Sequence, residues 1–356
     1  MSIEKIADQL LKQALHFAAT DIHITPQKNN YYIQFRLHGM LATIKSIPPK
    51  SGDRLISHLK FMASMDISEK RKPQSGSFEV NLSNLLVALR ISTLPTTLAK
   101  ESLVIRILPQ DQSFSLENMT LFPSASHILK SLMVHSHGMI IFSGPTGSGK
   151  STTMYALAEH CAKKLNRRVV TLEDPVEKQN DALLQVQVNE KAGITYNTGL
   201  KAILRHDPDV IIIGEIRDAE TAHIAIRAAL TGHLVLSSLH TRDAKGAIYR
   251  LLEFGVKQQE IEQSLLAITA QRILTLICPL CGSNCSKYCT YTNQVKRTGV
   301  YEILYRQALE MALKESKGGK EVYHYPTIKK LIGKGHALGY ISIEEYKRWV
   351  FEEVDA

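Results

Sequence analysis

The chain has few aromatic residues and no apolar run long enough to cross a membrane. Aromatic residues make up 6% of its 356 residues, with a single tryptophan. The best membrane-span candidate, residues 265–277, is interrupted by Gln271 and Arg272, whereas a spanning helix needs about 20 apolar residues. The opening residues 1–18 have a helical pattern but carry charges inside it, which a signal peptide does not. These absences predict a cytosolic protein.

Cysteine is also scarce, and its distribution argues against a disulfide framework. Cys161 stands alone, and the other four lie in CPLCGSNCSKYC with C-x₂-C-x₃-C-x₃-C spacing: Cys278, Cys281, Cys285 and Cys289. In a reducing compartment such a cluster indicates metal. Four thiolates surround Zn²⁺ with no open position, so the pattern favours a structural zinc ion, with free or partly oxidised thiols as the alternative.

The charge balance is basic but not concentrated. The formal net charge is +9, hydrophobic residues make up 44% of the chain and charged residues 22%, which is typical of a globular protein. No basic stripe interleaved with aromatic residues is present, so direct sequence-specific nucleic-acid binding is not expected. A nucleic-acid translocase remains an alternative function.

The length predicts two domains. Residues 1–110 mix a helical opening with strand-like runs and indicate a smaller α+β domain, and the polar, proline-bounded residues 111–123 read as a linker. Residues 124–356 alternate apolar strands with helices, the pattern of an α/β domain with a mostly parallel sheet. This second domain contains the cysteine cluster (278–289) and predicted C-terminal helices (300–356), the first over 301–316. The N-terminal strands are expected at Tyr31–Leu37, Phe78–Leu82, Leu85–Leu94 and Ser102–Leu108.

A phosphate-binding loop follows the apolar run MIIFS and precedes a helix expected over 150–165. GPTGSGKS matches G-x-x-x-x-G-K-[ST] in the strand–loop–helix context that this motif requires. The lysine is expected to reach the β- and γ-phosphates of ATP, and the serine to ligate Mg²⁺. The predicted nucleotide-binding residues are Gly144, Pro145, Thr146, Gly147, Ser148, Gly149, Lys150, Ser151 and Thr152.

Carboxylates and a histidine follow the other apolar strands of this domain. Glu215 ends VIIIGE, Glu173 and Asp174 follow VVTL, and His240 closes LVLSSL. The carboxyl ends of parallel strands meet at one edge of the sheet, where ligands bind. Glu215 is therefore placed to act on Mg²⁺ or on the attacking water. Gly214 stands where a Walker B aspartate is usual, which leaves open a scaffold that binds nucleotide without turning it over. Each of these side chains also has a purely structural interpretation as a turn, cap or strand-end residue.

In this order and spacing, the motifs make the chain resemble the ATPases of type II secretion systems and type IV pili. The resemblance implies a RecA-like P-loop ATPase domain preceded by a smaller PAS-like α+β domain. It extends over nearly the whole sequence. The matching segments are ATDIHI (19–24), RKPQSG (71–76), VALRIST and SLVIRIL, GPTGSGKST, TLEDPVE, LRHDPDVIIIGEIRD (204–218) and TGHLVLSSLHT (231–241).

This resemblance also implies roles for particular residues. Glu173, Glu215 and His240 inherit places in the catalytic site, and Arg217 matches an arginine near it. Arg90 in LRIST and Arg106 in VIRIL match the arginines that the family's N-terminal domain brings to the nucleotide. The planar fork of arginine suits the charge on γ-phosphoryl oxygens, although strand arginines also make local ion pairs.

The family also suggests an assembly and its partners. It implies a homohexameric motor hydrolysing Mg²⁺–ATP, peripheral at the inner face of the cell membrane, acting on an inner-membrane platform protein and indirectly on pilins. The chain has no room for an extra domain ahead of ATDIHI, and it carries a tetracysteine cluster. Within the family it is most similar to the ATPases that assemble the competence pseudopilus for DNA uptake in Gram-positive bacteria.

Overall fold

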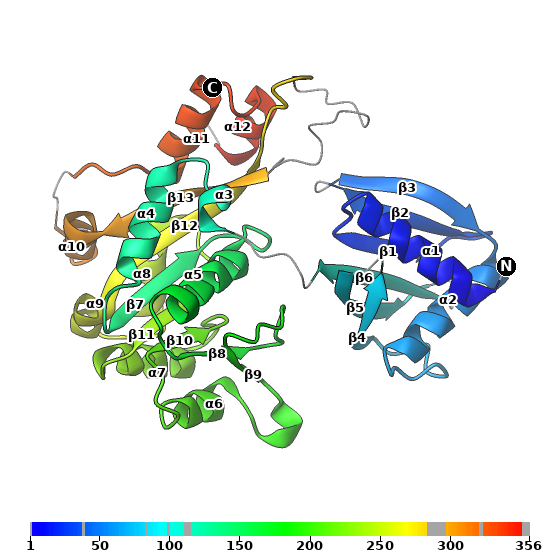
Figure 1. The fold of residues 1–356 in the computed structure, drawn as a ribbon, viewed down its shortest axis with the longest axis horizontal. Coiled ribbons are helices and arrows are strands. Elements are labelled where there is room, and N and C mark those ends of the chain that lie inside the picture. The colour runs from blue at the N-terminus through cyan, green and yellow to red at the C-terminus, as the bar shows by residue number, and fades with distance from the viewer. Residues whose placement is uncertain are drawn as a thin grey trace. The chain divides into compact units, whose positions relative to one another are not determined.

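Two compact units make up the chain. The structure is a computed structural model, and it describes residues 2–37, 40–82, 85–97, 100–109, 115–282, 297–319 and 323–350. Unit 1 comprises residues 1–112 and 177–179, and unit 2 comprises residues 113–176 and 180–356 (Figure 1). None of the described helices is long and apolar enough to cross a membrane.

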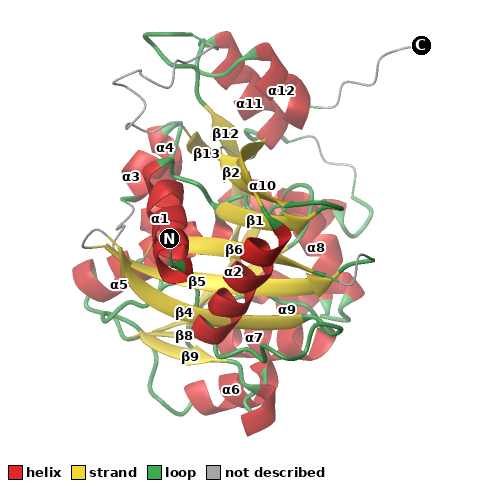
Figure 2. Cartoon of the chain, turned by 90° about the vertical axis from the view of Figure 1, so that its right-hand side faces the viewer, coloured by secondary structure: helices red, strands yellow, loops and turns green. Residues whose placement is uncertain are grey.

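Unit 1 is an antiparallel sheet with two helices. Its elements are α1 (Ile3–His16), β1 (Asp21–Pro26), β2 (Tyr31–Leu37), β3 (Met40–Ile47), α2 (Pro49–Met62), β4 (Gln74–Leu82), β5 (Leu85–Pro95) and β6 (Glu101–Pro109). The strand order is β3-β2-β1-β6-β5-β4. Alternate residues of β1, β2, β5 and β6 and one stripe of each helix are buried in a single apolar cluster. Helices α1 and α2 lie in front of this sheet in Figure 2. The expected α+β fold is confirmed.

Four of the six strands of unit 1 were predicted. β2 agrees with its predicted range, and β4, β5 and β6 contain theirs. β1 and β3 were missed. β1 is short and begins within the motif ATDIHI. The side chains of β3 are mostly exposed or half-buried, so its apolar alternation is weak.

Unit 2 is a seven-stranded sheet between two layers of helices. Its elements are α3 (Leu116–Met119), α4 (Pro123–Leu132), β7 (Gly138–Ser143), α5 (Lys150–Lys164), β8 (Val169–Glu173), β9 (Leu184–Gln187), a 3₁₀ turn (Glu190–Ala192), α6 (Tyr196–Ile203), β10 (Val210–Ile213), α7 (Ala219–Leu230), β11 (Leu234–Leu239), α8 (Ala244–Glu253), α9 (Gln258–Ser264), β12 (Leu265–Thr275), β13 (Arg297–Tyr305), α10 (Arg306–Glu315), α11 (Ile328–Ala337) and α12 (Ile343–Trp349). The strand order is β13-β12-β7-β11-β10-β8-β9, with only β13 antiparallel to its neighbour.

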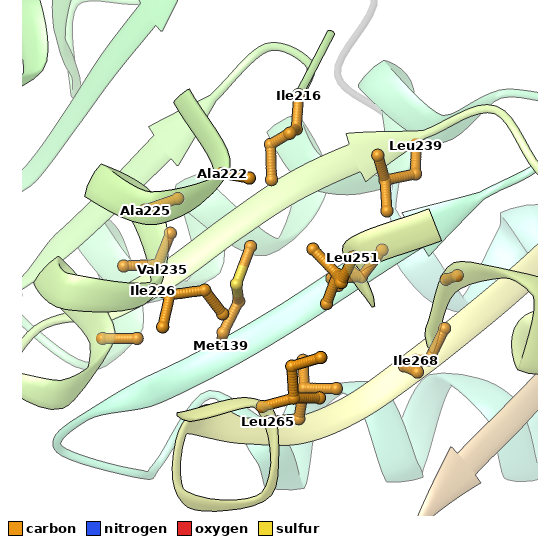
Figure 3. Packing of buried hydrophobic residues seen from close by; sticks show 14 of the residues in the cluster. Met139, Ile216, Ala222, Ala225, Ile226, Val235, Leu239, Leu251, Leu265 and Ile268 are labelled. Atoms are coloured by element: carbon orange, nitrogen blue, oxygen red, sulfur yellow. The ribbon is translucent and has the colours of Figure 1, made fainter. Parts of the chain in front are cut away.

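Helices cover both faces of strands β7, β8, β10 and β11, so every residue along these strands is buried. Alternate residues point to opposite sides. One set packs with α6 to α10, and the other with α3, α4 and α5. Figure 3 shows the first layer, in which Ala225 and Ile226 of α7 and Leu251 of α8 pack beside Met139 and Val235. This arrangement is the expected α/β fold, and it brings the carboxyl ends of β7, β8, β10 and β11 to one edge.

The start of the predicted C-terminal helical region is wrong. Residues 301–305 belong to strand β13, and the helix begins only at Arg306. The sequence VYEILY places β-branched and aromatic side chains in succession, and nearly all of them are buried beside β12. Burial against a neighbouring strand outweighs the helical period that residues 306–315 do follow.

Candidate functional site

The phosphate loop, Gly144–Ser151, connects strand β7 to the first turn of helix α5. Gly144 and Gly149 have φ of +146° and +87°, a region that L side chains rarely adopt. A Cβ atom on Gly149 would lie 2.8 Å from Gln271 Nε2, and one on Gly144 would lie 2.6 Å from the Gln271 carbonyl oxygen. Both positions therefore require glycine, because of their conformation and because the loop lies directly against β12.

The loop presents donors suited to phosphate. Lys150 is buried, and its Nζ donates to the carbonyl oxygens of Gly144 at 2.8 Å and Pro145 at 3.2 Å. Ser148 Oγ is buried without a hydrogen-bond partner in the described part of the chain. An unsatisfied buried hydroxyl is costly, and a polyphosphate oxygen would satisfy it. Together with the N-terminal amides of α5, this set of donors fits the phosphates of a nucleotide. Thr146, Gly147, Ser151 and Thr152 lie on the same loop or in the first turn of α5.

Glu173 ends strand β8 and is connected to the phosphate helix. It is 6% exposed. Its Oε1 accepts a hydrogen bond from Thr171 Oγ1 at 2.6 Å, and its Oε2 accepts one from Tyr155 OH at 2.5 Å. Tyr155 lies on α5, and its hydroxyl also accepts from Gln185 Nε2 at 3.2 Å. The carboxylate is therefore held in one orientation by a residue of the helix that begins at the phosphate loop.

Glu215 follows strand β10 and has a partner on each carboxylate oxygen. Oε2 lies 3.2 Å from His240 Nε2, and Oε1 accepts from Arg217 Nε at 2.5 Å. Arg217 Nη1 lies 3.5 Å from Asp174 Oδ2, so its guanidinium links two carboxylates. The hydrogen bond to Glu215 is the main cause that raises the pKa of Arg217 above its usual value. Four predicted residues of three strand ends thus form one network.

Hydrogen bonds that involve backbone groups hold the ends of β10 and β11 together. Ser238 Oγ donates to the Gly214 carbonyl oxygen at 2.8 Å, and the Ile216 amide donates to the Ser238 carbonyl oxygen at 3.0 Å. A Cβ atom on Gly214 would lie 3.6 Å from Glu173 Cα, so the segments that carry Glu173 and Glu215 are neighbours. The glycine that stands in place of a Walker B aspartate therefore lies against the end of strand β8.

Three arginines of unit 1 lie in a row across its sheet. The register places Arg36 of β2 opposite Asp21 of β1, Asp21 opposite Arg106 of β6, and Arg106 opposite Arg90 of β5. Asp21 is buried, and its Oδ1 lies 3.0 Å from Arg106 Nε while its Oδ2 lies 3.8 Å from Arg36 Nε. Arg90 and Arg106 therefore share one face of unit 1. Their action on nucleotide stays a prediction.

The cysteine cluster is described only in part. Cys278 and Cys281 lie in a turn closed by the bond from the Gly282 amide to the Cys278 carbonyl oxygen, 2.8 Å. Cys285 and Cys289 lie outside the described residues. Within the described ranges, no group of three or more His, Cys, Asp or Glu side chains is arranged to hold a metal. The zinc site stays a prediction.

Sequence reasoning missed the polar layer beneath the loop. Thr153 Oγ1 donates to Gln271 Oε1 at 3.1 Å and lies 3.1 Å from Tyr301 OH, and all three residues are buried. The signal was present: Gln271 and Arg272 interrupt an otherwise apolar strand. On the sequence alone the interruption excludes a membrane span; in the structure it marks the side chains that support the phosphate loop.

A glycine loop that meets the N-terminus of α5, with carboxylates from adjacent strand ends, defines a RecA-like P-loop ATPase. The chain belongs to the family described as type II/IV secretion system protein, whose model matches residues 1–348. It is 54% identical over 355 residues to Competence protein ComGA of Bacillus subtilis (strain 168), covering 99% of both chains.

Solved structures share the fold. The ATPase DotB of Legionella pneumophila aligns with a TM-score of 0.73 at 20% identity, covering 96% of this chain and 94% of that one. The pilus retraction motor PilT with bound ADP aligns with a TM-score of 0.71 at 24% identity, covering 98% of both. At these identities the likeness concerns the fold alone.

Proposed function

We propose that this protein is the ATP-hydrolysing motor that drives assembly of a competence pseudopilus used for DNA uptake. The observation that carries the proposal is the 54% identity to a competence protein across 99% of both chains. The geometry of the phosphate loop and of the Glu215 network supports it, because a motor needs both a phosphate site and a group that acts on water. The same relationship supports a place at the inner face of the cell membrane, beside a platform protein that acts on pilins.

The chemistry is assigned to the residues of unit 2. Lys150 exchanges its two carbonyl partners for the β- and γ-phosphate oxygens of ATP, and Ser151 ligates the Mg²⁺ that accompanies the substrate and offsets its charge. Glu215 orients the attacking water and accepts its proton. His240 and Arg217 hold the Glu215 carboxylate from its two sides. Glu173, held by Tyr155, would help to hold this Mg²⁺ from the neighbouring strand end.

The motor action is assigned to a homohexameric ring. Residues 1–110 and 124–356 act as separate domains joined by the linker 111–123, and Arg90 and Arg106 reach a nucleotide only when the ring closes around it. An arginine that arrives on closure makes hydrolysis depend on movement. Asp21 positions Arg106 for this role through their 3.0 Å ion pair.

The four cysteines are assigned to a structural zinc ion that holds the segment after β12. Metal analysis of the purified protein, together with melting in the presence and absence of a chelator, tests this assignment. About one zinc per chain and a lower melting temperature on chelation are expected for a closed thiolate site. Protein that contains no zinc and melts unchanged with chelator contradicts it.

The motor proposal is tested in purified protein and in cells. Wild type should hydrolyse ATP, Lys150→Ala should not, and only the wild-type gene should restore pseudopili to a strain that lacks its own copy. Hydrolysis that is strongly stimulated by DNA, without an effect on pseudopili, would favour a translocase instead. Tight ATP binding with negligible turnover in wild type would favour a nucleotide-regulated scaffold.

A further inference from the structure

A buried guanidinium lies where the phosphate loop meets the segment after His240. Arg272 of β12 is 8% exposed. Its Nη1 donates to the Gln271 carbonyl oxygen at 2.8 Å, and its Nη2 donates to the carbonyl oxygen of Arg242. Arg242 belongs to the short connection between β11 and α8, which begins with His240. One planar group thus holds the backbone of β12 and the backbone that follows the predicted catalytic histidine.

The same guanidinium contacts the start of the phosphate loop. A Cβ atom on Gly144 would lie 3.2 Å from Arg272 Nη1, so the first glycine of the loop packs directly on it. A second link runs beside it, because Ser143 Oγ donates to the Thr241 carbonyl oxygen at 3.2 Å. Movement of the phosphate loop at Gly144 therefore displaces the backbone at Arg242, and movement of the His240 segment displaces Gly144.

On its other side Arg272 contacts the C-terminal helices of unit 2. Its Cζ lies 5.6 Å from the ring centroid of Trp349, the only tryptophan of the chain. Trp349 Nε1 donates to Glu345 Oε1 at 3.1 Å, which fixes the ring within α12. The indole is therefore placed to report any movement of the guanidinium.

The charge of Arg272 is not matched by a direct ion pair among the described residues, and its hydrogen-bond acceptors are backbone carbonyl oxygens. Burial lowers the pKa of its guanidinium, and the acidic groups of Glu302 and Asp243 oppose that effect. Glu302 is also buried, and its Oε1 accepts from the first amide of α8, that of Ala244, at 3.2 Å. Placing a cation here has an energetic cost that an apolar side chain would avoid. The rigid guanidinium plane carries the two donors on separate nitrogens, Nη1 and Nη2, and so fixes the spacing of the two carbonyls, whereas lysine has a single donor nitrogen on a flexible stem.

We propose that Arg272 is a positioning residue for ATP hydrolysis: it sets the spacing between the phosphate loop and the His240 segment and passes changes at the loop to Trp349. This inference rests on the proposed roles of the loop and of His240. Because Arg272 acts through the backbone of other residues, its loss should lower turnover more than it weakens nucleotide binding.

Arg272→Lys keeps the charge and removes the fork. We expect kcat to fall by about 10- to 100-fold, the effect of misplacing a catalytic group by about 1 Å, while KM for ATP changes by less than about threefold. The matched control is Arg167→Lys. Arg167 also binds only carbonyl oxygens in the described residues, those of Met133, Val134 and His135 at 2.8, 3.0 and 2.6 Å, but beside α4. Equal loss of kcat in both variants, or unchanged kcat in Arg272→Lys, overturns the proposal.

Trp349 fluorescence tests the proposed link between the phosphate loop and Trp349, first in the wild-type protein and then in Arg272→Lys. Saturating Mg²⁺–ADP should change the emission of Trp349 in wild type, and the change should disappear in Arg272→Lys although dialysis shows that ADP is still bound. Unchanged wild-type emission with ADP bound overturns the link to Trp349. Failure of wild type to bind or hydrolyse ATP would instead refute the proposed function, so the two failures are distinguishable.

Discussion

Replacement of Glu215 by glutamine separates the chemistry of this carboxylate from its place in the fold. The amide has nearly the same shape. Its oxygen accepts from Arg217 as Glu215 Oε1 does now, and its NH₂ group donates toward His240, 3.2 Å from Oε2 in the native side chain. What disappears is the negative charge and the ability to take a proton from water.

The expected magnitudes differ for stability and rate. The ion pair with Arg217 is partly exposed, with 57% of the arginine side chain accessible, so its loss should cost no more than about 1 kcal/mol of unfolding free energy. Loss of a general base typically costs about 10²- to 10⁴-fold in rate. Glu215→Gln should therefore fold normally and bind ATP, with kcat reduced by at least about 100-fold.

The assay is phosphate release at saturating ATP, combined with nucleotide affinity and thermal melting. Glu253→Gln is the matched control, because Glu253 forms a partly exposed ion pair with Arg250 at 2.7 Å on α8. It should leave kcat unchanged. If Glu215→Gln keeps turnover within a few-fold of wild type, the assignment of Glu215 is wrong, and Glu173 becomes the candidate base.

Two further predictions concern Asp21 and Cys161. Asp21→Asn weakens the ion pair that holds Arg106, so kcat should fall several-fold with little change in ATP affinity. The control Asp8→Asn breaks the exposed ion pair with Lys12 and should not alter kcat. Equal kcat in both variants would contradict a positioning role for Asp21. Burial raises the pKa of the Cys161 thiol to about 11 from 9.0, so the native state keeps a proton that the unfolded chain loses between these values. Its contribution is present below pH 9 and is lost as pH rises to about 11, and denaturant titrations should show wild type losing about 2–3 kcal/mol more than Cys161→Ala across that range. A parallel decline of both proteins would show that the thiol does not contribute.

The parts of the fold predicted correctly are those with strong local patterns. VIIIGE and MIIFS are too apolar to lie anywhere but in a buried sheet, and GPTGSGKS marks the turn into a helix. Helix α5, expected over residues 150–165, spans Lys150–Lys164. The errors fall where the secondary structure depends on burial against segments distant in the sequence. The period of residues 301–305 does not reveal that β12 runs beside them, and the exposed residues of β3 carry no clear alternation.

The candidate site shows the same contrast between features set by local sequence and features set by tertiary packing. Strand-end carboxylates were predictable, because parallel strands must deliver their carboxyl ends to one edge. The network of Glu215, Arg217, His240 and Asp174 agrees with that reasoning. The side chains that support the phosphate loop were not predictable, because Gln271 and Arg272 lie more than a hundred residues from the loop in the sequence. Only the order of β12 beside β7 brings them there.

The central claim, that hydrolysis occurs in a cooperating ring, is tested most directly by mixing inactive subunits into wild type. Lys150→Ala removes the phosphate contact at a loop and should leave assembly intact. If every subunit of a six-membered ring must be active, an equal mixture retains only about 2% of the wild-type rate, whereas independent subunits retain about half. We predict a loss far steeper than dilution once the subunits have exchanged. A rate that falls in proportion to the fraction of Lys150→Ala, in rings shown to be mixed, would contradict the motor account.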